Sequence, residues 1–193
     1  GITSIGRNAF TGCGNVKELI IGKDVKKIGE SAFQSCESLV KIEVDERNEA
    51  YCSENAVLFN KDKTRMLLAG SLGSDYQIPE GVRQIETDAI KSNNGLESIT
   101  IPASLEEIDI TLFQECWNLK KIEVNEENKV YASDGGALLN KEKTILIACP
   151  RNIEDGYTIP DSVTSIGDHA FYDCDNITYI DLPDSLTTIG EYA

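Results

Sequence analysis

Hydrophobic positions along this chain recur in short, similar runs. In each run an apolar residue is followed three positions later by a second and two positions after that by a third, as in Leu39, Ile42 and Val44. The end of each run alternates between apolar and polar positions, which is typical of a strand with one buried face. The pattern predicts short strands near the ends of the segments 16–21, 39–44, 96–101, 119–124 and 177–182.

A second block of sequence precedes each of these runs. The block IGRNAFTGC at 5–13 returns as IGESAFQSC at 28–36 and as IGDHAFYDC at 166–174, and weaker copies begin at Ile85 and Ile108. A period of about 23 residues is typical of a solenoid, because one such coil buries its apolar side only by stacking on its neighbours. We expect a short helical turn in each block, with its Ala, Phe and Cys side chains directed inward from the side opposite the strands.

Two longer intervals separate the copies, and each contains one enlarged coil, at about 45–78 and 125–159. The segments 76–79 and 157–160 each have a strand-like pattern that ends in a Pro. The apolar residues Ile78 and Ile159 in these segments lie seven positions before the first residue of the next block. The strands of all coils then align, which predicts a single parallel sheet. Its inward column contains Ile21, Val44, Ile78, Ile101, Val124, Ile159 and Leu182.

The two enlarged coils also resemble each other. Tyr51 and Ser53 match Tyr131 and Ser133, and the run NKDKT at 60–64 matches NKEKT at 140–144. Apolar runs flank these polar turns, so we predict a β-hairpin projecting from the solenoid in each coil, with turns at 60–63 and 140–143.

The IGxxAFxxCxxLxxIxLPxxVxxIG repeat and the YxSxxGxLxNKxKTxL insert resemble the BspA-like leucine-rich repeat family over essentially the whole chain. With the spacings, this resemblance implies an α/β-type repeat solenoid: a right-handed coil with a parallel concave sheet, short helical turns on the convex side and hairpin insertions in the enlarged coils. We expect one domain over 1–193. The repeat departs from the family pattern at Ala89-Ile90 and Thr111-Leu112-Phe113, where we expect irregular convex turns.

Known members of this family are mostly surface or secreted bacterial proteins, with relatives in parasitic protists, and some bind host matrix proteins. The resemblance therefore implies an extracellular or cell-surface location and a protein or glycan partner, such as host extracellular matrix. A rigid stalk that displays another domain, without its own ligand, is the alternative function. The chain begins and stops within repeats, so we expect a piece of a longer array whose uncapped coils associate end to end.

Strand alternation directs two columns of side chains onto the concave face. This face is either merely solvated or a true contact surface, because a rigid array presents many side chains without further ordering cost. One column contains Glu18, Lys41, Asp75, Ser98, Lys121, Gly156 and Tyr179, and the next contains Ile20, Glu43, Gln77, Thr100, Glu123, Thr158 and Asp181. The candidate partner-binding residues are Glu18, Lys41, Glu43, Gln77, Thr100, Lys121, Glu123, Thr158, Tyr179 and Asp181, together with Trp117.

Trp117 occupies a repeat position that carries Gly14, Glu37, Asn94 and Asp175 in the other copies. A large aromatic residue at a polar position packs against the neighbouring coil or serves as a contact hot spot. The cysteines at the last position of the block form a second column, which we interpret as buried thiols. They are Cys13, Cys36, Cys116 and Cys174.

Composition and chemistry narrow the functional classes further. With 33 acidic and 18 basic residues, the formal charge of −15 repels nucleic acid and anionic membrane surfaces. No apolar run is long enough to insert into a bilayer. The single histidine, His169, lies at a repeat position otherwise occupied by exposed residue types, and no nucleophile, phosphate-loop, dinucleotide or metal spacing is present. We therefore expect neither catalysis nor a cofactor or metal site.

Overall fold

The computed structural model describes residues 1–113 and 115–193, which form two compact units. Unit 1 comprises Gly1–Gly73, Gly81–Gly95 and Glu107–Glu115, and unit 2 comprises Ser74–Glu80, Leu96–Glu106 and Cys116–Ala193. Each unit is a stack of strand-bearing coils. Within the described ranges, no helix has the length and apolar character that crossing a membrane requires.

Nearly all regular structure is short strand. The first group contains the strands at the positions predicted for the parallel sheet: β2 (Glu18–Ile21), β4 (Lys41–Val44), β8 (Asp75–Gln77), β10 (Ser98–Ile101), β11 (Lys121–Val124), β15 (Gly156–Thr158) and β17 (Tyr179–Asp181). A second group consists of β1 (Ser4–Ile5), β3 (Lys27–Ile28), β9 (Gln84–Ile85), β16 (Ser165–Ile166) and β18 (Thr188–Ile189). The enlarged coils add β5 (Tyr51–Glu54), β6 (Val57–Asn60), β7 (Arg65–Ala69), β12 (Tyr131–Asp134), β13 (Ala137–Asn140) and β14 (Ile145–Ala148).

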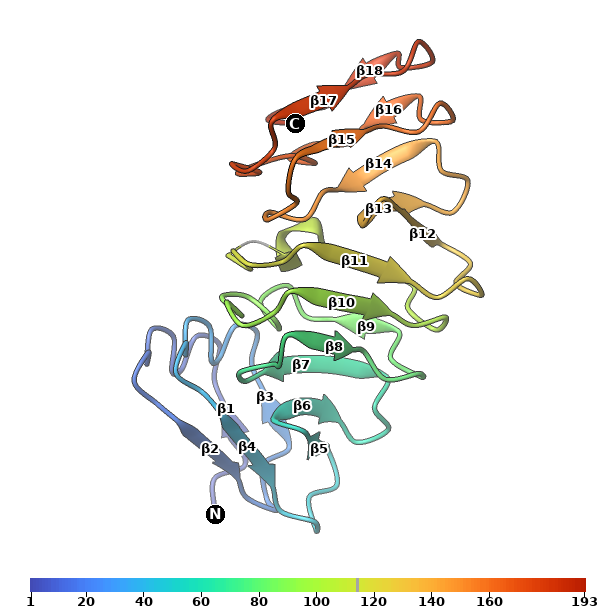
Figure 1. Ribbon diagram of the computed structural model, residues 1–193. Helices are drawn as coiled ribbons and strands as arrows, with labels where there is room; N and C mark the ends of the chain where they lie inside the picture. Colours follow the sequence, from blue (N-terminus) through green and yellow to red (C-terminus); the bar gives the residue numbers. More distant parts are fainter. Residues whose placement is uncertain (114) are drawn as a thin grey trace. The chain divides into compact units, whose positions relative to one another are not determined.

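The first group pairs in parallel with the register that the 23-residue repeat predicts (Figure 1). Leu19 lies opposite Ile42 and Ile99 opposite Ile122, so equivalent residues of successive coils stack directly. The inward column of these strands is largely buried, with Ile21, Ile78, Ile101 and Ile159 all at 4% exposure or less. The strand positions and the repeat register are thus confirmed. Leu182, at the last position of the column, is 52% exposed.

The predicted seven-strand sheet is wrong, because these strands form three separate sheets. They are β2–β4, β11–β10–β8 and β15–β17. Each interruption falls at an enlarged coil, where a serine hydroxyl accepts the backbone N–H at the end of the preceding strand. Ser53 Oγ accepts from Val44 N at 3.0 Å, and Ser133 Oγ accepts from Val124 N at 3.1 Å. These side chains take a ladder position that a neighbouring strand would otherwise occupy.

Each enlarged coil folds into a three-stranded antiparallel meander, and the predicted turns are confirmed. Lys63 N donates to Asn60 O, and Lys143 N donates to Asn140 O. The expectation that the hairpins project is wrong, because their central strands are buried. Val57, Leu58 and Phe59 of β6 are at most 1% exposed, and Ala137, Leu138 and Leu139 of β13 are fully buried. The meanders therefore form core and not protrusions.

The last strand of each meander joins the second group of strands. β7 pairs in parallel with β9, and β14 pairs with β16, which in turn pairs with β18. Each enlarged coil thus remains part of its stack on this side, although the ladder of the first group is interrupted.

The helical turns expected over the IGxxAF blocks are wrong, and the backbone shows why. Asn8, Ser31 and His169, at one repeat position, have φ of 52–58°, and the residue before the column cysteine is also left-handed in every block. A left-handed residue interrupts a right-handed helix. The exception is the 3-10 helix η1 (Ile110–Phe113), in a block that departs from the repeat and has no left-handed residue over 108–113.

One buried asparagine links each meander to the coil before it. The side-chain amide of Asn48 donates to Gly22 O at 2.8 Å and to Val25 O at 3.0 Å, and its oxygen accepts the N–H groups of Ala50 and Tyr51. Asn128 makes the equivalent four bonds in unit 2, to Pro102, Leu105, Val130 and Tyr131. Both N–H donors and both oxygen lone pairs of each amide are thereby used, which stabilises an otherwise costly buried group.

Candidate functional site

The candidate binding residues other than Trp117 lie in register on the outward sides of the first-group sheets. We call these outward positions the strand face. Glu18 pairs with Lys41 and Thr158 with Asp181, so each pair shares one column. Gln77, Thr100 and Glu123 form a continuous row across β8, β10 and β11. The structure places these residues in three sheets, so they form three separate groups and not one array.

Charged residues of the strand face neutralise one another. Lys41 Nζ lies 3.5 Å from Glu18 and 3.2 Å from Glu43, and these hydrogen-bonded carboxylates raise the pKa of Lys41. Lys121 forms an ion pair with Glu123 in the same way. Such exposed pairs contribute little to stability, because water and salt screen them. On β17, in contrast, Asp181 makes no ion pair among the described residues.

The strand face also exposes large apolar groups. Ile20 is 68% exposed and Tyr179 is 57% exposed. Tyr179 lies across Gly156, its register neighbour, where a glycine leaves the backbone uncovered. A rigid exposed aromatic ring with a polar hydroxyl is a typical anchor for a partner.

Trp117 contacts an arginine that the sequence analysis did not single out. The guanidinium of Arg151 lies 4.7 Å from the centre of the Trp117 ring and 5.8 Å from that of Tyr172. Arg151 Nη1 is 2.8 Å from Asp173 Oδ2, although the pair lacks hydrogen-bond alignment. Trp117 thus packs on the next coil, as one alternative predicted, yet 48% of it remains exposed.

The cysteine column is only partly buried. Cys116 is fully buried, but Cys13, Cys36 and Cys174 are half-buried, so the expectation of a uniformly buried column is wrong. All six thiols are free. The Cys174 thiol donates weakly to the carbonyls of Cys149 and Pro150. A hydrogen bond with Cys174, together with burial, raises the pKa of Cys149, so this thiol stays protonated and unreactive at neutral pH.

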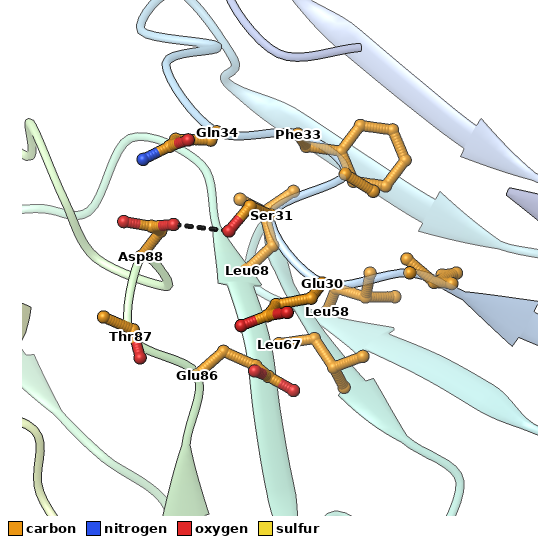
Figure 2. A pocket seen from close by; sticks show the side chains of 13 residues that line it. Glu30, Ser31, Phe33, Gln34, Leu58, Leu67, Leu68, Glu86, Thr87 and Asp88 are labelled. Carbon is orange, nitrogen blue, oxygen red and sulfur yellow. Dashed lines mark hydrogen bonds between the residues drawn. The ribbon is translucent and has the colours of Figure 1, made fainter. Parts of the chain in front are cut away.

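Unit 1 has a gap on the side opposite the strand face, between the convex turns of two coils (Figure 2). We call it the convex gap. Figure 2 shows the turn with Glu30, Ser31 and Phe33 facing the turn with Glu86, Thr87 and Asp88, and Leu58, Leu67 and Leu68 also line the gap. Ser31 Oγ donates to Asp88 Oδ2 at 2.8 Å and bridges the two turns. The gap arises because the enlarged coil between these turns has a strand, β7, in place of a convex turn.

Beyond the Ser31–Asp88 bridge the convex gap widens into a cavity of about 370 Å³. Its walls are mainly polar, and Lys91 lies 4.0 Å from Asp88 and 3.5 Å from Glu115. The lining residues include Ser35, Glu37, Ser38, Gly70, Ser71, Asp88, Lys91, Ser92, Asn93 and Gly95. Sequence reasoning missed this cavity, although the absence of an AFxxC block from the enlarged coil was the available signal.

His169 is exposed and stacks on Tyr192, with the ring centres 5.2 Å apart. Over the described residues, no group of three His, Cys, Asp or Glu side chains is arranged to hold a metal ion.

Stacked coils of about 23 residues with registered parallel strands and a buried apolar column define a β-solenoid of the leucine-rich repeat class. The chain belongs to the BspA-type leucine-rich repeat family, whose model matches six copies over residues 1–64, 70–155 and 149–193. Members of such a repeat family are protein-interaction or structural modules and are in general non-catalytic. No curated protein matches this chain.

Solved bacterial proteins share the fold. A leucine-rich repeat protein from Eubacterium ventriosum is 25% identical, with a TM-score of 0.62 over 99% of this chain and 48% of that one. A leucine-rich cell surface protein from Faecalibacterium prausnitzii is 22% identical, with a TM-score of 0.55, over 98% of this chain and 61% of that one. The pneumococcal vaccine antigen PcpA is 22% identical, with a TM-score of 0.54, over 100% and 40%. The chain therefore spans between 40% and 61% of the length of these proteins.

Proposed function

We propose that this chain is a non-catalytic interaction module of a bacterial cell-surface or secreted protein, and that it binds a protein partner through its strand face. The observation that carries this proposal is the exposure of Tyr179 and Ile20 at registered positions of short, rigid sheets. Exposed apolar groups on a regular sheet are suited to a desolvating contact, and beside Ile20 the ion pairs of Lys41 reduce the charge that must lose its water.

The surface location is supported by family membership and by structural relatives such as the cell surface protein from Faecalibacterium prausnitzii. A host extracellular matrix protein is the partner type that we favour. The formal charge of −15 opposes nucleic acid as a partner, because phosphate backbones carry the same sign of charge.

The proposal is tested by measuring binding of the purified chain to immobilised matrix proteins such as fibronectin, laminin and collagen, with a glycan array in parallel. We expect saturable binding to a protein that falls at least tenfold in Tyr179→Ala. Charge reversal at Glu43, Glu123 and Asp181 tests the three sheets separately. Asp62→Lys, on an exposed meander turn, is a matched control and leaves affinity unchanged.

If saturable binding is found only on the glycan array, the partner is a carbohydrate and the proposal of a protein partner fails. If no protein or glycan binds, the chain is a structural spacer, and the interaction proposal fails.

A further inference from the structure

The two enlarged coils have equivalent positions on their convex sides, and backbone hydrogen bonds establish the equivalence. Ala69 N donates to Ala89 O in the first coil, as Cys149 N donates to Ala170 O in the second. Two or three residues later, Ser71 N donates to Leu39 O and Asn152 N donates to Leu119 O. Between these bonds the first coil has only Gly70, whereas the second has Pro150 and Arg151.

Arg151 is therefore the one inserted residue that makes the second enlarged coil longer. Arg151 is buried, with 8% of the residue exposed. Its guanidinium lies among Trp117, Tyr172 and Asp173. In unit 2 this position on the convex side is thus filled by a cationic side chain of the chain itself. The contacts combine an aromatic face with a carboxylate, which is how proteins commonly hold a guanidinium.

The equivalent position in unit 1 is the cavity of the convex gap. The residues around Arg151 are replaced there by others: Glu37 replaces Trp117, Ser92 replaces Asp173, and Lys91 replaces Tyr172, so neither aromatic ring is present. Asn176 and Asn152, which are bonded at 2.6 Å in unit 2, correspond to Gly95 and Ser71. No arginine follows Gly70, so the cavity of about 370 Å³ stays open.

The charges around this cavity favour a cation. Glu37 and Asp88 line it, and Glu115 contacts Lys91 from beside it. Lys91 is the single basic residue of its lining among the described residues, and both of its ion-pair partners are carboxylates. Glu37 is exposed and makes no ion pair within the part of the chain described. The net charge of these groups is negative, as is that of the whole chain.

We propose that the convex gap of unit 1 is a pocket for the arginine side chain of a partner protein, which takes the place that Arg151 fills in unit 2. The guest guanidinium lies beside the carboxylates of Glu37 and Asp88, over the small residues Gly70 and Ser71. This surface is distinct from the strand face, so the two proposals stand or fail separately.

The test uses two short peptides, acetyl-Gly-Arg-Gly-amide and the same peptide with citrulline, whose urea group is a neutral isostere of guanidinium. Binding to the ¹⁵N-labelled chain is followed by NMR chemical-shift titration. We expect the arginine peptide to bind at least about fivefold more tightly, because charge-assisted contacts are lost with citrulline. The shifted amides are those of Ser35, Ser71 and Ser92.

Variants localise the site. Glu37→Gln and Asp88→Asn each weaken the arginine peptide several-fold; Asp88→Asn retains an acceptor for Ser31. Ser71→Arg supplies the guest from the chain itself and abolishes binding. Glu49→Gln, an exposed carboxylate outside the gap, is the matched control, and charge reversal at Glu43, Glu123 and Asp181 leaves peptide affinity unchanged.

Equal affinity for both peptides, absence of binding, or shifts outside the gap would overturn the proposal. Methyl glucoside shifting the same amides in preference to the arginine peptide would assign the pocket to a polyol instead.

Discussion

Tyr179 lies across Gly156 on the strand face of the β15–β17 sheet, and the ring occupies the space where a Cβ atom on residue 156 would be. An aromatic side chain that covers a cross-strand glycine shields the backbone and compensates for the absence of a side chain there. The two residues therefore form one packing unit.

This relationship predicts that the effect of Gly156→Ala on stability changes sign when Tyr179 is replaced. Gly156→Ala destabilises the wild-type chain by about 1 kcal/mol, because the new methyl group displaces the Tyr179 ring. In a Tyr179→Ser background, the same change stabilises by about 0.5 kcal/mol, because alanine suits a strand better than glycine does. Urea unfolding of the four proteins measures both values. The same effect of Gly156→Ala in both backgrounds would contradict the contact.

Replacement of the buried asparagines tests how the meanders are held. Asn48→Ala or Asn128→Ala leaves one carbonyl, Val25 O or Leu105 O, and two N–H groups without the amide partner, and we expect a loss of about 2–4 kcal/mol in the free energy of unfolding. Glu49→Ala, next to Asn48 but exposed, is the control and changes stability by no more than about 0.5 kcal/mol. Thermal and urea denaturation provide the measurement. A loss equal to that of the control would show that these amides do not secure the meander.

The hydroxyl of Tyr157 gives a prediction on pH. It donates to Asp134 O at 3.1 Å, and burial, reinforced by Cys149 and Asp134, raises its pKa well above that of an exposed tyrosine. The native state then holds a proton that the unfolded state has released, so stability falls as the pH rises above about 10.

Tyr157→Phe is expected to reduce this alkaline loss of stability, while it costs about 1 kcal/mol at neutral pH through the missing hydrogen bond. Urea unfolding between pH 7 and 11 measures the change, and tyrosinate absorbance follows the ionisation directly. Tyr179→Phe, which alters an exposed ring, is the comparison and leaves the pH dependence as in the wild type. Identical alkaline profiles for Tyr157→Phe and the wild type would refute the assignment.

Exposed apolar groups on β17, directly after it and on β18 lead to a prediction of self-association. Ile180, Leu182 and Ile189 are 39%, 52% and 57% exposed, whereas the equivalent Ile122 and Ile166 of covered coils are at most 3% exposed. An unpaired strand edge with an apolar face pairs readily with another chain. We expect the apparent mass in sedimentation to rise with concentration, and Ile189→Lys to lower it. A constant monomer mass over a hundredfold range of concentration would contradict this.

The repeat pattern predicted the strands and their register because stacking forces equivalent residues of successive coils into contact, as Leu19 and Ile42 show. It also predicted the outward columns and the turn at Asn60–Lys63. It did not predict where the sheet stops, because that depends on one hydroxyl, Ser53, which competes with a ladder hydrogen bond and leaves no trace in the apolar pattern.

The convex turns were mispredicted for a related reason. Apolar spacing over IGxxAF is compatible with a helix, but the backbone at Asn8 and His169 is left-handed. Asn and His adopt that conformation more readily than most residues, and this was the signal available in the sequence. Arg151 was overlooked because a single inserted residue changes no repeat position and shows only as a longer interval.

The duplicated coils, one with its convex position occupied by Arg151 and one with it open, illustrate a property of stacked architectures. Each coil contacts only its neighbours, so a change of a few side chains in one coil leaves the packing of distant coils intact. Tandem duplication can thus preserve one copy for structural integrity while the other acquires new specificity, and successive coils can diversify independently along a single chain.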